Sequence, residues 1–181
     1  MLAATLCDSC RVTRLAIAVV GRDRPGIVAA VTAALEDQEC SLEDVSTSIL
    51  RGYFAMMLIC HGPPDKAAVA GRLESVASDL GLLLDVWEVG QAGASHEPDH
   101  VLTVYGPDRL GIVHKVASLL AQENVNICDM ACRLVEQDSP LYLVNMEIQI
   151  PSGVQLEPAL RAGLPPLGLR HALHPLERDV L

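Results

Sequence analysis

The order of hydrophobic and polar positions is nearly the same in the two halves of the chain. After Ile27, and again after Ile112, apolar residues follow at steps of one, three and four positions. These steps place side chains on one face of a helix, so amphipathic helices are predicted over 26–38 and 111–123. The apolar residues of the two faces are Ile27, Val28, Val31 and Leu35, and, 85 residues later, Ile112, Val113, Val116 and Leu120.

Alternating or short apolar runs around these helices predict strands, because successive strand residues point to opposite faces. Each half then reads β-α-β-β-α-β, which is the ferredoxin-like pattern. The predicted fold class is α+β, with two such domains in tandem, each a four-stranded antiparallel sheet with both helices on one face. The predicted strands are 14–20, 41–49, 54–60, 82–89, 100–105, 126–134, 141–150 and 167–176, and the further helices are 65–80 and 154–162.

A small, polar, proline-containing stretch, GQAGASHEPD, separates the two halves and is typical of a linker. The chain is long enough to build two small hydrophobic cores. The predicted divisions are an N-terminal extension at 1–12, a first domain at 13–90, a linker at 91–99, a second domain at 100–176 and a C-terminal tail at 177–181.

The first strand of each half leads into its helix through a repeated phrase, GRDRPGIV at 21–28 and GPDRLGIV at 106–113. Asp23 and Asp108 are expected to be N-caps, which accept hydrogen bonds from amides one turn further on. Pro25 suits the first helical turn, where its missing N–H has no cost. The phrase therefore predicts the same capped helix start in both halves.

The glycines of this phrase, Gly26 and Gly111, carry no Cβ and are expected to allow close backbone approach. A helix N-terminus with free amides attracts anions. The phrase is therefore a candidate site for the carboxylate of a ligand. The alternative is a well-capped helix start that binds nothing.

Composition limits the classes of partner. The net charge is −10 and only 3% of residues are aromatic, so neither a basic footprint nor stacking platforms for nucleic acid are expected. No apolar run approaches the roughly 20 residues of a membrane span. The first residues lack the pattern of a secretory signal, and six cysteines then suggest reduced thiols. We expect a cytoplasmic protein that contacts neither membrane nor nucleic acid directly.

Candidate metal and catalytic groups are incomplete. CDSC at 7–10 is a single C-x-x-C, whereas zinc sites usually need a second pair. Cys128 and Cys132 share a predicted strand face, and the histidines of HEPDH (96–100) and HALH (171–174) are expected to be solvated. Phosphate-binding loops, nucleophile elbows and zinc-helix motifs do not occur in the sequence. We expect no catalytic residue, no metal, no cofactor and no enzymatic activity.

The repeated phrase, together with a polar and an aliphatic residue opening the second strand (Ser41-Leu and Asn126-Ile), resembles the tandem ACT-domain proteins. The resemblance covers residues 13–176. It implies amino-acid binding at interfaces between paired domains. Loop amides would hold the ligand carboxylate, and a polar loop side chain with the residue opening the second strand would hold the amino group.

Carried onto this sequence, the resemblance implies ligand-binding positions in both halves. Many members of the family have Asn in the loop where this chain has Asp, and a carboxylate also suits an ammonium group. Leu110 replaces the proline in the second loop, and Ser41 has less reach than Asn126. We favour a site that uses Asp108 and Asn126. The implied residues are Asp23, Gly26, Ile27 and Ser41 in the first half and Asp108, Gly111, Ile112 and Asn126 in the second.

Within this family the chain most resembles the two-domain repressors of the glycine cleavage system. That resemblance implies an amino-acid-sensing regulator without a DNA-binding domain of its own. Its expected partners are a small amino acid, with glycine as the first candidate, and a DNA-binding regulator protein. A homodimer is an open alternative for its assembly. The competing hypothesis is an ACT-type interaction module that binds no ligand.

Overall fold

The computed structural model describes four stretches of the chain. The predicted N-terminal extension, with the CDSC motif, and the predicted tail lie outside them, as do residues 91–96 of the predicted linker. The predicted domain bounds 13–90 and 100–176 remain predictions. The described residues are 13–62, 65–90, 97–135 and 140–176.

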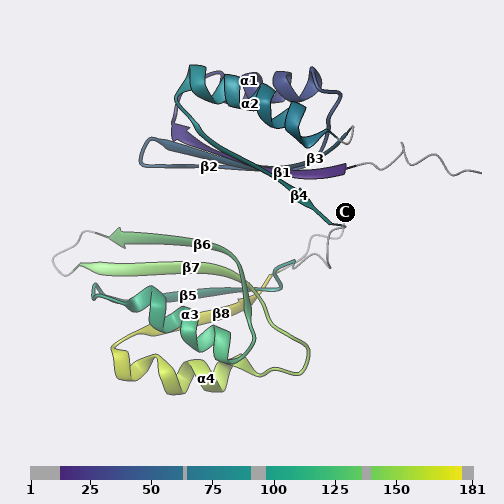
Figure 1. Cartoon of the computed structure of the whole chain (residues 1–181). Coiled ribbons are helices and arrows are strands. Elements are labelled where there is room, and N and C mark those ends of the chain that lie inside the picture. The colour runs from purple at the N-terminus through teal and green to yellow at the C-terminus, as the bar shows by residue number, and fades with distance from the viewer. Residues whose placement is uncertain (1–12, 63–64, 91–96, 136–139, 177–181) are drawn as a thin grey trace, which may run out of the picture. The chain divides into compact units, whose positions relative to one another are not determined.

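The chain forms two compact units, residues 1–93 and 94–181. Each unit has two helices on one face of a four-stranded sheet (Figure 1). The first contains β1 (Thr13–Arg22), α1 (Ile27–Glu36), β2 (Ser41–Leu50), β3 (Tyr53–Gly62), α2 (Lys66–Leu80) and β4 (Leu83–Val89). The second contains β5 (His100–Pro107), α3 (Ile112–Gln122), β6 (Asn126–Val135), β7 (Leu141–Gln149), α4 (Leu156–Gly163), the 3₁₀ turn η2 (Pro165–Leu167) and β8 (Arg170–Pro175).

The strand orders are β2-β3-β1-β4 and β6-β7-β5-β8, and all pairs are antiparallel. This confirms the predicted α+β class with two ferredoxin-like βαββαβ units. In both units the first strand, β1 or β5, lies inside the sheet. The strand that follows the first helix, β2 or β6, lies at an edge. None of the helices in the described residues is long and apolar enough to cross a membrane.

The predicted helix stripes form the cores. Val31 and Leu35 of α1, and Val116 and Leu120 of α3, are buried against the sheets. Val28, predicted on the same stripe, is 44% exposed. A helix turns by about 100° per residue, so the residue after Ile27 lies at the margin of the buried face.

The helix starts differ from the prediction. Neither Asp23 nor Asp108 caps its helix, because the N-cap residues are Gly26 and Gly111 and neither helix has a side-chain cap bond. The predicted helix 26–38 also ends earlier, since α1 closes at Glu36. Pro25 therefore precedes the helix instead of occupying its first turn.

The two N-cap glycines are required by backbone conformation and not by close approach. Gly26 has φ 97° and Gly111 φ 85°, and a Cβ built on either would meet nothing within 4 Å. Only glycine occupies this left-handed region without steric cost. No neighbouring backbone lies against either glycine in the described residues, and the close approach of a ligand stays a prediction.

Gly111→Ala should destabilise the second unit by about 1 kcal/mol, because it forces a side chain into a left-handed conformation. Gly71→Ala is the matched control, since Gly71 lies within α2, has open space at Cβ and no positive φ. That change should stabilise by roughly 0.5–1 kcal/mol. Urea unfolding of both variants measures the difference, and equal effects would contradict the assigned role of Gly111.

Candidate ligand site at the start of α3

The N-terminus of α3 is an uncapped helix end. Its first backbone bond runs from Lys115 N to Gly111 O at 3.0 Å, and no side chain caps it. The amides of the first turn therefore have no helical acceptor. Together with the helix dipole, such amides favour a carboxylate or another anion.

A hollow of about 320 Å³ lies at this end of α3. The loop and first helical turn, Asp108 to Val113, form most of its lining. Tyr142 of β7 supplies the remaining side chain. Of the four residues predicted for the second unit, three line this hollow: Asp108, Gly111 and Ile112. The fourth, Asn126, does not line it.

Tyr142 gives the hollow a hydroxyl. A hydrogen bond with Cys132, burial, and the nearby Asp108 carboxylate together raise the pKa of the Tyr142 phenol. The hydroxyl therefore keeps its proton at neutral pH and can donate a hydrogen bond. The Asp108 side chain itself is exposed and can accept from an ammonium group.

The same corner of the first unit lacks this hydroxyl. Tyr142 pairs with Gly106, and at the equivalent place Phe54 pairs with Gly21. Phe54 is buried, with 6% exposure, and offers no hydrogen-bonding group. Sequence reasoning missed Tyr142 because the longer second hairpin moves it away from the constant offset that aligns the two halves.

Within one unit, the loop and the residue that opens the second strand are far apart. Pro107 pairs with Leu141 of β7, whereas Asn126 pairs with Gln149 at the other end of that strand. Eight strand residues span about 26 Å. The Asn126 amide instead donates to the Cys128 sulfur at 3.6 Å. A ligand held by both Asp108 and Asn126 therefore needs residues from two domains.

The first unit has the same separation. Arg22, beside Asp23, pairs with Tyr53, and Ser41 pairs with His61 eight residues along β3. Asp23 and Ser41 consequently lie at opposite ends of one sheet.

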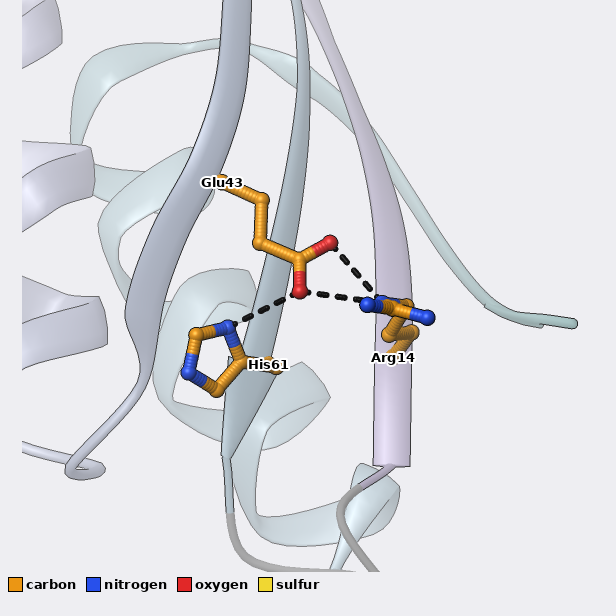
Figure 2. Close-up of polar contacts among 3 residues, drawn as sticks. All are labelled: Arg14, Glu43 and His61. Atoms are coloured by element: carbon orange, nitrogen blue, oxygen red, sulfur yellow. Dashed lines mark hydrogen bonds and ion pairs between the residues drawn. The ribbon is translucent and has the colours of Figure 1, made fainter. Parts of the chain in front are cut away.

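The end of the first sheet that holds Ser41 carries a charged cluster from three strands (Figure 2). Arg14 of β1 donates from Nε to both carboxylate oxygens of Glu43, each at 2.9 Å. Glu43 lies in the bulge of β2, and its Oε1 is 3.1 Å from His61 Nδ1, without hydrogen-bond alignment. Because the Glu43 carboxylate neutralises Arg14, this pair adds little attraction for the carboxylate of a ligand.

Two of the histidines considered in the sequence have carboxylate partners close by. His100 Nδ1 is 2.7 Å from Asp99 Oδ1, and His171 Nε2 is 3.3 Å from Glu157 Oε2. Burial is the main cause that raises the pKa of Cys60, to about 12, so this thiol stays protonated and unreactive.

Comparison with known proteins agrees with this architecture. An ACT domain family model matches residues 13–87. A UPF0237 protein of Bifidobacterium longum is 38% identical over 69 residues, which are 36% of this chain and 77% of the relative. The chain belongs to the ACT-domain family. A UPF0237 protein of Methanopyrus kandleri is 43% identical over 47 residues, 26% of this chain but only 52% of that protein.

Two solved structures share the tandem ACT fold over most of the chain. A protein of unknown function from Galdieria sulphuraria has a TM-score of 0.79 at 22% identity, covering 92% of this chain and 100% of that one. A candidate glycine cleavage system transcriptional repressor has a TM-score of 0.72 at 18% identity, covering 92% and 99%. At these identities the similarity concerns the fold.

Proposed function

We propose that this ACT-domain protein is an amino-acid-sensing regulator that acts through a partner transcription factor. The proposed effector is a small amino acid, with glycine as the first candidate, because the similar fold of the candidate glycine cleavage repressor suggests it. The proposed location is the cytoplasm, and a homodimer is a proposed assembly. Regulation without catalysis is the role typical of this family.

The observation that carries the proposal is the hollow at the start of α3. Free first-turn amides would receive the carboxylate of an amino acid, and Asp108 would receive its ammonium group. The Tyr142 hydroxyl supplies one more donor in the wall. These three groups complement the two charges that every free amino acid carries.

The remaining proposed binding residues follow from the same geometry. Gly111 and Ile112 contribute backbone at the helix start, and Asn126 would join from a second domain, since it lies far from Asp108 in its own unit. In the first unit the corresponding proposed residues are Asp23, Gly26, Ile27 and Ser41. We favour the second unit because its hollow has the Tyr142 hydroxyl.

Titration of the protein with each of the twenty amino acids by calorimetry should reveal one or a few that bind. Asp108→Ala should then weaken binding by roughly 1.5–3 kcal/mol, the range for a hydrogen bond to a charged group. Asp129→Ala is the matched control, because this exposed carboxylate lies on β6 and does not line the hollow. No heat with any amino acid at millimolar concentration would refute the proposal, and an unchanged affinity of Asp108→Ala would move the site elsewhere.

The second candidate function is an interaction module without a ligand. Its supporting observation is β2, in which all ten side chains are exposed although the strand is long. An uncovered edge strand can pair with another chain. A pull-down with a purified transcription factor separates the two functions: recovery that ignores added amino acid favours the module, and recovery that responds to it favours the sensor.

A further inference from the structure

The first unit gathers three arginines at the end of the sheet where its helix begins. Arg22 ends β1, Arg24 follows in the loop, and Arg51 lies in the turn between β2 and β3. The loop and the turn are joined by a hydrogen bond from Asp23 N to Gly52 O at 2.9 Å. The chain as a whole carries a net charge of −10, so a group of three cations on adjoining segments is a local exception.

These arginines are exposed and their charges are not neutralised by ion pairs within the described residues. Arg22 lies over the Tyr53 ring, 5.2 Å from its centroid. Arg24 donates to the backbone oxygen of Asp79 at 3.4 Å. The nearest carboxylate in sequence, Asp23, forms no ion pair with them in the described residues. Arg24 is thus directed toward α2, and the guanidinium groups of Arg22 and Arg51 can receive a partner's carboxylates.

The helices leave one face of the first sheet uncovered (Figure 1). Large apolar side chains adjoin the arginines on this face. Leu50 pairs with Tyr53 and Leu83 pairs with Val20, which places all four on that face. Leu50 is 74% and Leu83 75% exposed. A hollow of about 210 Å³ continues from Val20 along the same face. Such an exposed apolar patch marks an interaction site.

The second unit differs from the first at the end of the sheet where the helix begins. Pro107 stands at the end of β5 where Arg22 ends β1. On the uncovered face, Ala18 pairs with Met57 in the first unit, whereas Thr103 pairs with Asn145 in the second and donates to it at 2.9 Å. The same sheet position is thus apolar and open in one unit and hydrogen-bonded in the other. The two units therefore differ at this end of the sheet, whereas the exposed arginines on the uncovered face of the second sheet, Arg133 and Arg170, stand on either side of Tyr105.

We propose that this arginine surface (Arg22, Arg51, Leu50, Tyr53 and Leu83) binds a segment of a partner protein in which acidic residues alternate with large apolar ones. Arginine and aromatic residues are enriched at protein interfaces, and opposite charge fixes register and speeds association. A second copy of the same surface would set arginine against arginine. Nucleic acid would not use the aliphatic side chains, and the net charge opposes it. The inference rests on the proposed function, whose partner protein it characterises.

The test uses the full chain and a short dye-labelled peptide that repeats Glu-Leu-Glu-Phe-Ser, followed by fluorescence anisotropy. The wild-type protein should bind this peptide, and added salt should weaken binding. The double variant Arg22→Gln/Arg51→Gln should bind about tenfold or more weakly, as expected when two charge-assisted contacts are lost. The matched control is Arg133→Gln/Arg170→Gln, since both arginines are exposed on the uncovered face of the second sheet and should leave binding unchanged.

The binding assay can overturn the inference in four ways: no binding of the acidic peptide, equal binding of the peptide with Gln in place of Glu, equal weakening in the control variant, or tighter binding of a short single-stranded RNA. Sedimentation at the peptide-binding concentration tests the remaining occupant, because self-association lost in Arg22→Gln/Arg51→Gln would assign the surface to a second copy and also overturn it. Calorimetry with amino acids on this variant keeps the two proposals apart. If the wild-type protein binds an amino acid but not the peptide, only the proposed arginine surface is refuted. If it binds the peptide but no amino acid, only the proposed amino-acid sensing is refuted.

Discussion

Leu120→Ala should cost the second unit about 2–5 kcal/mol of folding free energy, the range for removing a fully buried leucine side chain. Leu120 closes the buried stripe of α3 and is 0% exposed among the residues of the second core. The substitution removes its contacts with the sheet and leaves a cavity. Because net stabilities of domains are only about 5–15 kcal/mol, the second unit should unfold at much lower urea concentration.

The two units have separate cores, so the effect of Leu120→Ala should be local. Leu35 of α1 is the equivalent residue of the first core and is 1% exposed. Hydrogen exchange read by mass spectrometry should show lost protection in α3, β5 and β7 for Leu120→Ala, and in α1, β1 and β3 for Leu35→Ala. Equal loss in both units for either variant would contradict two independent cores.

The fold could be predicted because the strongest signal in the sequence is also its dominant energetic term. The stripes that end at Leu35 and Leu120 recur at a constant distance, and hydrophobic burial of these stripes decides the architecture. Helix ends depend on smaller effects. Asp23 and Asp108 have side chains that suit an N-cap, but each helix begins after the glycine three residues later, which has a positive φ. The sequence does not show whether the aspartate or the glycine becomes the N-cap.

The candidate site was only partly predictable. The loop glycine and Asp108 were found because they lie in the repeated phrase, and the hollow forms around them. Tyr142 comes from a strand that passes the loop only after folding, and no local pattern marks it. The distance between Asp108 and Asn126 follows from sheet register: both residues lie at ends of strands, but at opposite ends of the sheet.

The position just before the loop gives the second large prediction. Gly106 of β5 has no positive φ, but a Cβ there would lie 2.9 Å from the backbone oxygen of Gly168 and 2.8 Å from a methyl group of Leu169. Backbone atoms cannot rotate away as a side chain can. Gly106→Ala should therefore destabilise the second unit by about 3 kcal/mol, the upper end of the range for overpacking.

Gly21→Ala separates this close approach from the general effect of glycine in a strand. At the equivalent position of the first unit, a Cβ would lie 2.4 Å from the end of the Leu82 side chain, while the nearest backbone atom is 3.4 Å away. Leu82 can change rotamer at a cost of order 0.5–1.5 kcal/mol, and alanine regains part of this through better strand propensity. Gly21→Ala should accordingly cost less than about 1 kcal/mol in urea unfolding. If the two variants lost equal stability, the close backbone approach at Gly106 would not be the cause of the loss.

Gly106→Ala can also affect the candidate site, because Gly106 is joined to Asp108 through Pro107. If the variant weakened amino-acid binding beyond its effect on stability, the shift of β5 would extend to Asp108. The packing of β5 against the segment before β8 would then set the geometry of the candidate site.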